Sequence, residues 1–124
     1  MATILVVEDD ENIQQFIRKA LSKEGYDVVS ASDGAEAFKL ITVHHPALIL
    51  LDMWMPTMDG YAFINQYSAT IQDKRPIVVM TADHFTASNK EATAVIASIL
   101  IKPFGFDDLL QTVQKYVPLE NRMQ

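Results

Sequence analysis

Short runs of apolar residues alternate with longer amphipathic stretches along the chain. The clearest run covers residues 47–51, Ala-Leu-Ile-Leu-Leu, and is followed by Asp52 and, four residues later, by Pro56. Five consecutive apolar residues are too few for an ordinary helix and are typical of a strand buried on both faces of a parallel sheet. Comparable short runs predict strands at residues 3–7, 26–31, 77–80 and 98–101.

Between these strands, apolar residues recur at the spacing of helices that bury one face. Gly25 predicts the end of the first helix, and Asp33-Gly34-Ala35-Glu36 resembles a capping box at the start of the second. A weak, mostly polar helix is predicted at residues 86–94. The other four helices are defined by Ile13, Phe16, Ile17, Ala20 and Leu21; by Ala37, Phe38 and Ile41; by Tyr61, Ile64, Tyr67 and Ile71; and by Phe106, Leu109, Leu110 and Val113.

Five strands alternating with five helices predict an α/β fold, a doubly wound five-stranded parallel sheet with helices on both faces. The flavodoxin-like strand order 2-1-3-4-5 fits five strands and has its switch point between strands one and three. The 124 residues are expected to form a single domain, with residues 117–124 as a C-terminal tail. This length is sufficient to bury roughly two thirds of the surface of the unfolded chain.

The composition narrows the classes of function. Hydrophobic residues make up 49% of the chain and charged residues 21%, as in globular proteins. A net charge of -6 argues against a nucleic-acid interface and against binding to an anionic membrane. The chain lacks cysteine, which excludes disulfides and thiolate chemistry. No signal peptide or membrane-spanning run is recognisable, so a cytoplasmic location is expected.

Polar residues follow four of the predicted strands. In a sheet of this order, ligands bind outside the carboxyl ends of the strands. Several carboxylates in one crevice repel each other unless a cation such as Mg²⁺ neutralises them, and Lys and Thr side chains suit phosphoryl oxygens. A carboxylate can also act as a nucleophile in forming an aspartyl phosphate. These strand ends carry Glu8, Asp9 and Asp10; Asp52; Thr81 and Ala82; and Lys102 and Pro103.

The same residues resemble a known family. From the first strand through the last helix, the chain is similar to the receiver domains of bacterial two-component response regulators, in particular to single-domain, chemotaxis-regulator-like receivers. No single motif is specific, but together, in this order and at about this spacing, they are. The matching motifs are Val7-Glu8-Asp9-Asp10, Leu50-Leu51-Asp52-Met53-Trp54-Met55-Pro56, Met58-Asp59-Gly60, Met80-Thr81-Ala82 and Lys102-Pro103-Phe104.

The resemblance implies an acceptor and a metal site. Asp52 is expected to accept the phosphoryl group, and the expected cofactor is Mg²⁺, with Mn²⁺ as an alternative. Asp9 and Asp10 are expected to form the acidic pair of metal ligands, with Asp10 the more direct one. Asp52 itself and the backbone carbonyl of Trp54 would complete the set.

The resemblance also implies the groups that bind the phosphoryl oxygens. Thr81 and Lys102 are expected to bind them through their side chains, and Met53 and Ala82 through their backbone N–H groups. The peptide bond between Lys102 and Pro103 is expected to be cis. These roles describe a phosphoacceptor that catalyses only its own phosphorylation and dephosphorylation.

The expected partners follow from the same family. The phosphoryl donor is a histidine kinase or a phosphotransfer protein, and a downstream protein binds the surface formed by helix four, strand five and helix five. Family members usually carry an aromatic residue three positions before the lysine, where this chain has Ile99. Trp54 is bulky for its position, and Trp54 and Asp83 are expected to tune hydrolysis. The sequence leaves open whether the domain stands alone or belongs to a longer regulator.

Two other functions share features of this site. Phosphatases and mutases with an aspartate nucleophile resemble it but usually carry a second Asp two residues later, where this chain has Trp54. A pseudo-receiver, an interaction module that works without phosphate, typically lacks the acceptor, an acidic residue or the lysine, and all of these are present here. Incubation with acetyl phosphate and Mg²⁺ separates the three interpretations.

Overall fold

Five strands form one parallel sheet in the computed structural model, which describes residues 2–54, 60–82 and 94–118. Their order is β2-β1-β3-β4-β5, and every neighbouring pair is parallel. The predicted flavodoxin-like order is therefore confirmed, and β1 and β3 lie side by side at the switch point. The strands are β1 (Thr3–Val7), β2 (Asp27–Ala31), β3 (Leu48–Asp52), β4 (Ile77–Thr81) and β5 (Ile96–Ile101).

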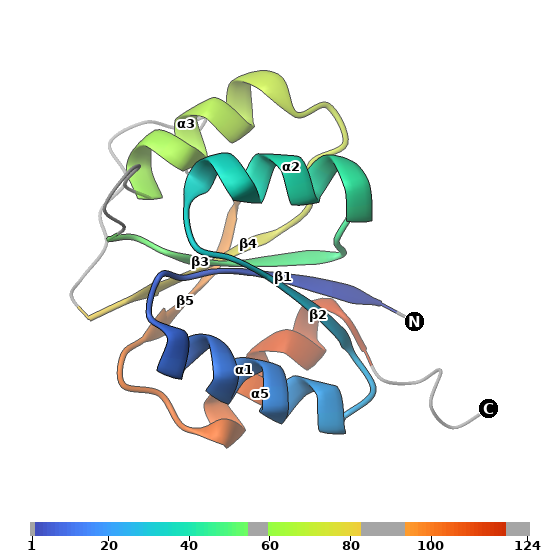
Figure 1. Ribbon diagram of the computed structural model, residues 1–124, viewed down its shortest axis with the longest axis vertical. Coiled ribbons are helices and arrows are strands. Elements are labelled where there is room, and N and C mark those ends of the chain that lie inside the picture. The colour runs from blue at the N-terminus through green and yellow to red at the C-terminus, as the bar shows by residue number, and fades with distance from the viewer. Residues whose placement is uncertain (1, 55–59, 83–93, 119–124) are drawn as a thin grey trace.

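Helices cover both faces of the sheet (Figure 1). One face carries α1 (Glu11–Lys23) and α5 (Phe106–Tyr116), and the other carries α2 (Gly34–His44) and α3 (Gly60–Thr70). The fifth predicted helix, at residues 86–94, falls almost entirely outside the described residues. None of the helices in the three described ranges has the length and apolar composition needed to cross a membrane.

Two hydrophobic cores lie on opposite faces of the sheet, and the central strands contribute to both. In β3, Ile49 and Leu51 belong to the core beneath α2 and α3, whereas Leu48 and Leu50 belong to the core beneath α1 and α5. All four side chains are buried. Because both faces of the strand are covered, its sequence contains no polar alternation and consists of apolar residues up to Asp52.

The predicted signals at the ends of the first two helices are also present. Gly25, just after α1, has a φ of 98°, in the left-handed region that favours glycine. Asp33 is the N-cap of α2 and accepts the N–H of Glu36 at 2.8 Å. The Glu36 carboxylate accepts the N–H of Ser32 at 2.8 Å, one residue before the position usual for a capping box. These bonds fix the loop between β2 and α2.

Candidate functional site

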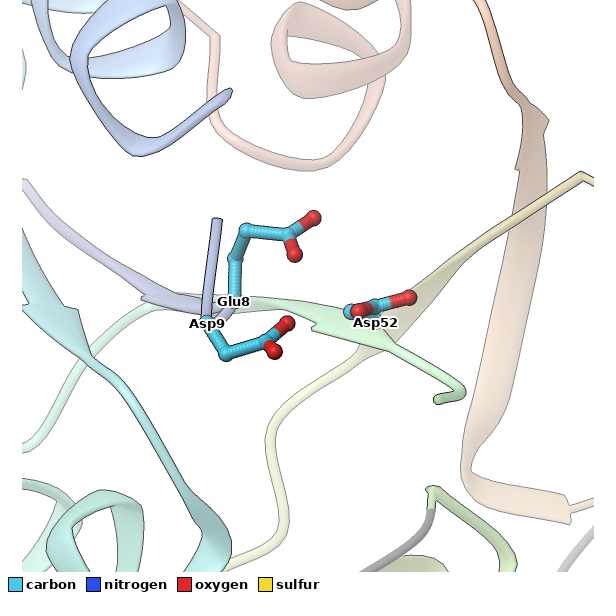
Figure 2. A group of neighbouring side chains, drawn as sticks. All are labelled: Glu8, Asp9 and Asp52. Atoms are coloured by element: carbon cyan, nitrogen blue, oxygen red, sulfur yellow. The ribbon is translucent and has the colours of Figure 1, made fainter. Parts of the chain in front are cut away.

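Three carboxylates meet where β1 and β3 end. Glu8 and Asp9 directly follow β1, and Asp52 is the last residue of β3 (Figure 2). One oxygen atom from each carboxylate lies within 4.8 Å of one from each of the others. The parallel pairing of Val7 with Leu51 brings the two strand ends to the same level. The register of the sheet therefore brings Asp52 next to two acids that lie more than forty residues earlier in the sequence.

A lysine from the edge of the sheet reaches this group. Lys102 follows β5, and its backbone N–H donates to the carbonyl of Thr81 at 2.8 Å. Its Nζ lies 2.7 Å from Oε1 of Glu8 and 3.3 Å from Oδ1 of Asp52. The peptide bond to Pro103 is cis, as the resemblance implied. One ammonium group thus pairs with two buried carboxylates, and the third carboxylate leaves the group with excess negative charge.

This arrangement shifts the pKa values of two of its members. Burial raises the pKa of Glu8 from 4.5 to about 7; the charge of Asp52 adds to this effect, and the hydrogen bond from Lys102 opposes it. Burial alone would lower the pKa of Lys102, but its hydrogen bond to Glu8 and the charges of Glu8 and Asp52 outweigh that effect and raise it. At neutral pH, Lys102 is therefore charged, and Glu8 is divided between its protonated and ionised forms.

The raised pKa of Glu8 predicts how Mg²⁺ binding at these carboxylates would depend on pH. We expect the affinity for Mg²⁺ to fall as the pH is lowered from 8 to 6, because a proton on Glu8 competes with the cation. With a pKa of about 7 in place of 4.5, this competition begins near neutrality. Calorimetric titration with Mg²⁺ at pH 6, 7 and 8 measures the effect, and Glu8→Gln is the control because glutamine cannot ionise. Equal affinities at pH 6 and 8 in the unchanged protein would contradict the prediction.

The same pKa shift predicts how the stability of the metal-free protein changes with pH. The folded state holds the Glu8 proton more tightly than the unfolded state does. Glu8 therefore contributes most to the free energy of unfolding at low pH. This contribution falls as the pH rises from about 4.5 to about 7, by on the order of 1 kcal/mol per pH unit for one proton. Urea unfolding in the presence of a chelator measures it, and Glu8→Gln should flatten the curve in that range.

The backbone after β3 also contacts the buried Asp52. The N–H of Trp54 donates to Oδ1 of Asp52 at 3.3 Å. The N–H of Met53, predicted to bind a phosphoryl oxygen, instead continues the sheet and donates to the carbonyl of Met80 at 3.3 Å. Of these two N–H groups, it is therefore that of Trp54 that reaches the Asp52 carboxylate. Trp54 is 62% exposed.

Asp10 has a different place from the one predicted for it. Its carboxylate is the N-cap of α1 and accepts the N–H groups of Asn12 at 2.8 Å and Ile13 at 3.2 Å. The converging group contains Glu8 in place of Asp10, although Glu8 is not among the metal ligands expected from the sequence. A signal was present in the sequence, because an Asp directly before a helix is a preferred N-cap.

The remaining predicted residues lie around the carboxylates or farther along the edge of the sheet. Thr81 is buried at the end of β4, and Ala82 follows it at the surface. Ala82 and Lys102 both line a hollow of about 430 Å³. Ile99 is half-exposed on β5, the edge strand beyond β4. Asp83 lies outside the described residues.

Comparison with known proteins agrees with this geometry. Residues 4–114 match the family described as the response regulator receiver domain. Sporulation initiation phosphotransferase F of Bacillus subtilis strain 168 is 32% identical over 121 residues, which are 95% of this chain and 95% of that protein. Response regulator MprA of Mycobacterium sp. strain KMS is 39% identical over 108 residues, which are 86% of this chain and 46% of MprA. The chain thus spans about half the length of that relative.

Among solved structures, the response regulator TrrA of Thermotoga maritima, in complex with Mg²⁺ and BeF, superposes with a TM-score of 0.80. It is 30% identical, and the match covers 94% of this chain and 99% of that one. The strand order, the carboxylates at the switch point and the match over residues 4–114 all agree. The chain belongs to the receiver-domain family of two-component response regulators.

Proposed function

We propose that Asp52 accepts a phosphoryl group from a phosphohistidine of a histidine kinase or phosphotransfer protein and later loses it by hydrolysis. The observation that carries this proposal is the setting of the Asp52 carboxylate. It is buried, it accepts hydrogen bonds at 3.3 Å from both the Nζ of Lys102 and the N–H of Trp54, and it lies beside two further carboxylates. Such a site suits phosphoryl transfer, which depends mainly on positioning and charge neutralisation.

In the transfer step, an oxygen of Asp52 forms a bond to phosphorus while the bond from phosphorus to the donor nitrogen breaks. The donor imidazole, protonated on its other nitrogen, then leaves as the neutral ring. The hydrogen bonds from Trp54 and Lys102 both go to Oδ1 of Asp52, so we propose Oδ2 as the oxygen that attacks. The ammonium of Lys102 would offset charge on the phosphoryl oxygens, and Thr81, at the end of the adjacent β4, would donate to one of them.

The donor set fits Mg²⁺. Three carboxylates converge, two of them buried, and a single ammonium does not balance their charge. A hard divalent ion prefers such oxygen ligands, and Glu8, Asp9 and Asp52, with the carbonyl of Trp54, would hold it. When bound, the ion would neutralise charge on the transferring phosphoryl group. The likeness to TrrA, whose structure contains Mg²⁺ and BeF, supports this assignment.

An apolar hollow beside Lys102 offers the donor protein a place to dock. It has a volume of about 430 Å³ and lies between α1 and the loop after β5. Phe16 of α1 and Phe104 of that loop form part of its lining, with ring centroids 6.4 Å apart, and Phe16 is 40% exposed. A protein that presents a phosphohistidine to Asp52 would therefore meet an apolar surface next to the site.

Phosphorylation of Asp52 would change the surface around β5 that is expected to bind a downstream protein. Replacing an ionised carboxylate by a phosphoryl group adds roughly one to one and a half negative charges, which attract Thr81 and Lys102. Ile99 and Ile101, 40% and 50% exposed, belong to the surface expected to bind a downstream protein. The helix predicted at residues 86–94, which would complete that surface, lies outside the described residues. Ile99 would contribute apolar contact, since it lacks the ring of the usual aromatic residue.

Incubation with acetyl phosphate, with Mg²⁺ or with a chelator, tests this function. An intact-mass increase of one phosphoryl group per chain that requires Mg²⁺ is the expected result. Continuous release of inorganic phosphate at a rate far above the decay of the phosphorylated chain would indicate a phosphatase. No mass increase from acetyl phosphate or from phosphohistidine donors would favour the pseudo-receiver.

The lifetime of the phosphoryl group should depend on Trp54. Its large side chain lies at the surface two residues after Asp52, where it would shield the phosphorus from water. We expect Trp54→Ala to hydrolyse the phosphoryl group faster than the unchanged protein. The decay is followed by intact mass after removal of the donor, and Tyr61→Ala, a change at another partly exposed aromatic residue, is the control. A decay that is unchanged or slower in Trp54→Ala would refute this prediction.

A further inference from the structure

Gly60, the first residue of α3, lies against the backbone that follows Asp52. Its N–H donates to the carbonyl of Met53 at 2.8 Å, and both residues are buried. A Cβ atom placed on Gly60 would lie 2.4 Å from Sδ and 2.7 Å from Cα of Met53, closer than real Cβ atoms approach other heavy atoms. The start of α3 and Met53 therefore approach each other as only a residue without a Cβ permits.

Space, and not backbone conformation, explains the glycine at this position. The φ of Gly60 lies outside the left-handed region, in contrast to the φ of 98° at Gly25. The end of the Met53 side chain could rotate away from an added methyl group, but its Cα could not. Any side chain at position 60 must therefore move the backbone of Met53 or the start of α3.

Met53 connects the two residues whose polar atoms meet at the site. Its own N–H is held by the carbonyl of Met80 at 3.3 Å, and its carbonyl accepts the N–H of Gly60. The next N–H along the chain, that of Trp54, donates to Oδ1 of Asp52 at 3.3 Å. A shift of the Met53 Cα would move the peptide group that carries the Trp54 N–H.

We propose that Gly60 is a positioning residue for the acceptor site. Because it lacks a Cβ, α3 can close onto Met53 and hold the N–H of Trp54 against Asp52. The same close packing of Gly60 against Met53 would also position the carbonyl of Trp54, the proposed metal ligand. The role of the carbonyl rests on the proposed function, whereas the hydrogen bond from Trp54 to Asp52 is present without any metal.

The variant Gly60→Ala tests this role, with Gly105→Ala as the matched control. Gly105 is the N-cap of α5 with a φ of -92°, and a Cβ there would meet nothing within 4 Å. In Gly60→Ala, the NMR signal of the Trp54 amide should shift in the metal-free protein, and Mg²⁺ affinity should fall by ~10- to 100-fold, as for groups that orient metal ligands. Gly105→Ala should leave both unchanged even if it lowers the stability of α5.

A second pair of variants keeps the test decisive if Gly60→Ala folds poorly. Met53→Ala removes the sulfur atom but keeps the backbone that a methyl group at position 60 would meet. Met53→Ala/Gly60→Ala should therefore still bind Mg²⁺ more weakly than Met53→Ala alone. Equal affinity in these two variants, or an unchanged Trp54 amide in folded Gly60→Ala, would overturn the proposal. The signal of the Trp54 amide can be measured without metal or phosphate. If the unchanged protein could not be phosphorylated, that result would therefore refute the proposed function but not the role of Gly60.

Discussion

Asp52→Asn is expected to abolish phosphorylation of the chain. The amide of asparagine is a poor nucleophile and carries no charge, so no acyl phosphate can form at this position. The change keeps the shape of the side chain and an oxygen that can accept the hydrogen bonds from Trp54 and Lys102. Intact-mass measurement after incubation with acetyl phosphate and Mg²⁺ should show no increase, and a protein phosphodonor should give the same result.

The control for this change is an acid outside the site. Asp73, which is exposed and pairs with Arg75, precedes β4 at the opposite end of the strands, so Asp73→Asn should be phosphorylated like the unchanged protein. Circular dichroism and urea unfolding establish that Asp52→Asn is folded. A phosphoryl group that still appears in folded Asp52→Asn would show that another residue is the acceptor.

Substitutions of the adjacent residues Asp9 and Asp10 are expected to have very different effects on Mg²⁺ affinity. Asp9→Asn should weaken Mg²⁺ binding by roughly tenfold or more, because it removes a charged oxygen from the converging carboxylates. Asp10→Asn should change the affinity little, since Asp10 caps α1 and asparagine is an equally good N-cap. Phosphorylation at limiting Mg²⁺ should follow the same order, and calorimetric titration measures the affinities directly.

This comparison separates two assignments of the metal ligands. Asp9→Asn and Asp10→Asn make the same chemical change at adjacent positions, so the two variants have the same net charge. Asp10→Ala adds a further check, because loss of the cap should lower the stability of the protein by about 1 kcal/mol without a matching loss of Mg²⁺ affinity. A larger loss of affinity in Asp10→Asn than in Asp9→Asn would restore the assignment made from the sequence alone.

Lys102 links the two buried carboxylates, so the proposed Mg²⁺ ion would change the contacts of its ammonium group. Its ammonium lies closer to Glu8, at 2.7 Å, than to Asp52, at 3.3 Å. A cation among the carboxylates would take over part of the charge compensation for Glu8. Lys102 would then be freer to interact with a phosphoryl group on Asp52, so the metal and the lysine would share the neutralisation of this site.

Within the described residues, the order of the elements, the strand order and the meeting of carboxylates where β1 and β3 end were predictable from the sequence. Short apolar runs ending in polar residues, such as residues 47–51 before Asp52, arise because a parallel strand is buried on both faces while its end is open. The cap at Asp33 and the end of the first helix near Gly25 were also predictable from the sequence. Each of these features depends on a few neighbouring residues, which is why local patterns reveal them.

Only the tertiary structure decided which polar atoms meet. Glu8, Asp9 and Asp10 are consecutive acids, and their separate roles depend on where β1 ends and α1 begins. The choice between the N–H groups of Met53 and Trp54 depends on pairing of the strand with β4, and the need for glycine at position 60 depends on the approach of α3. These contacts join residues that are distant in the chain, or they rest on differences of a few ångströms in packing, so no pattern of residue types along the sequence specifies them.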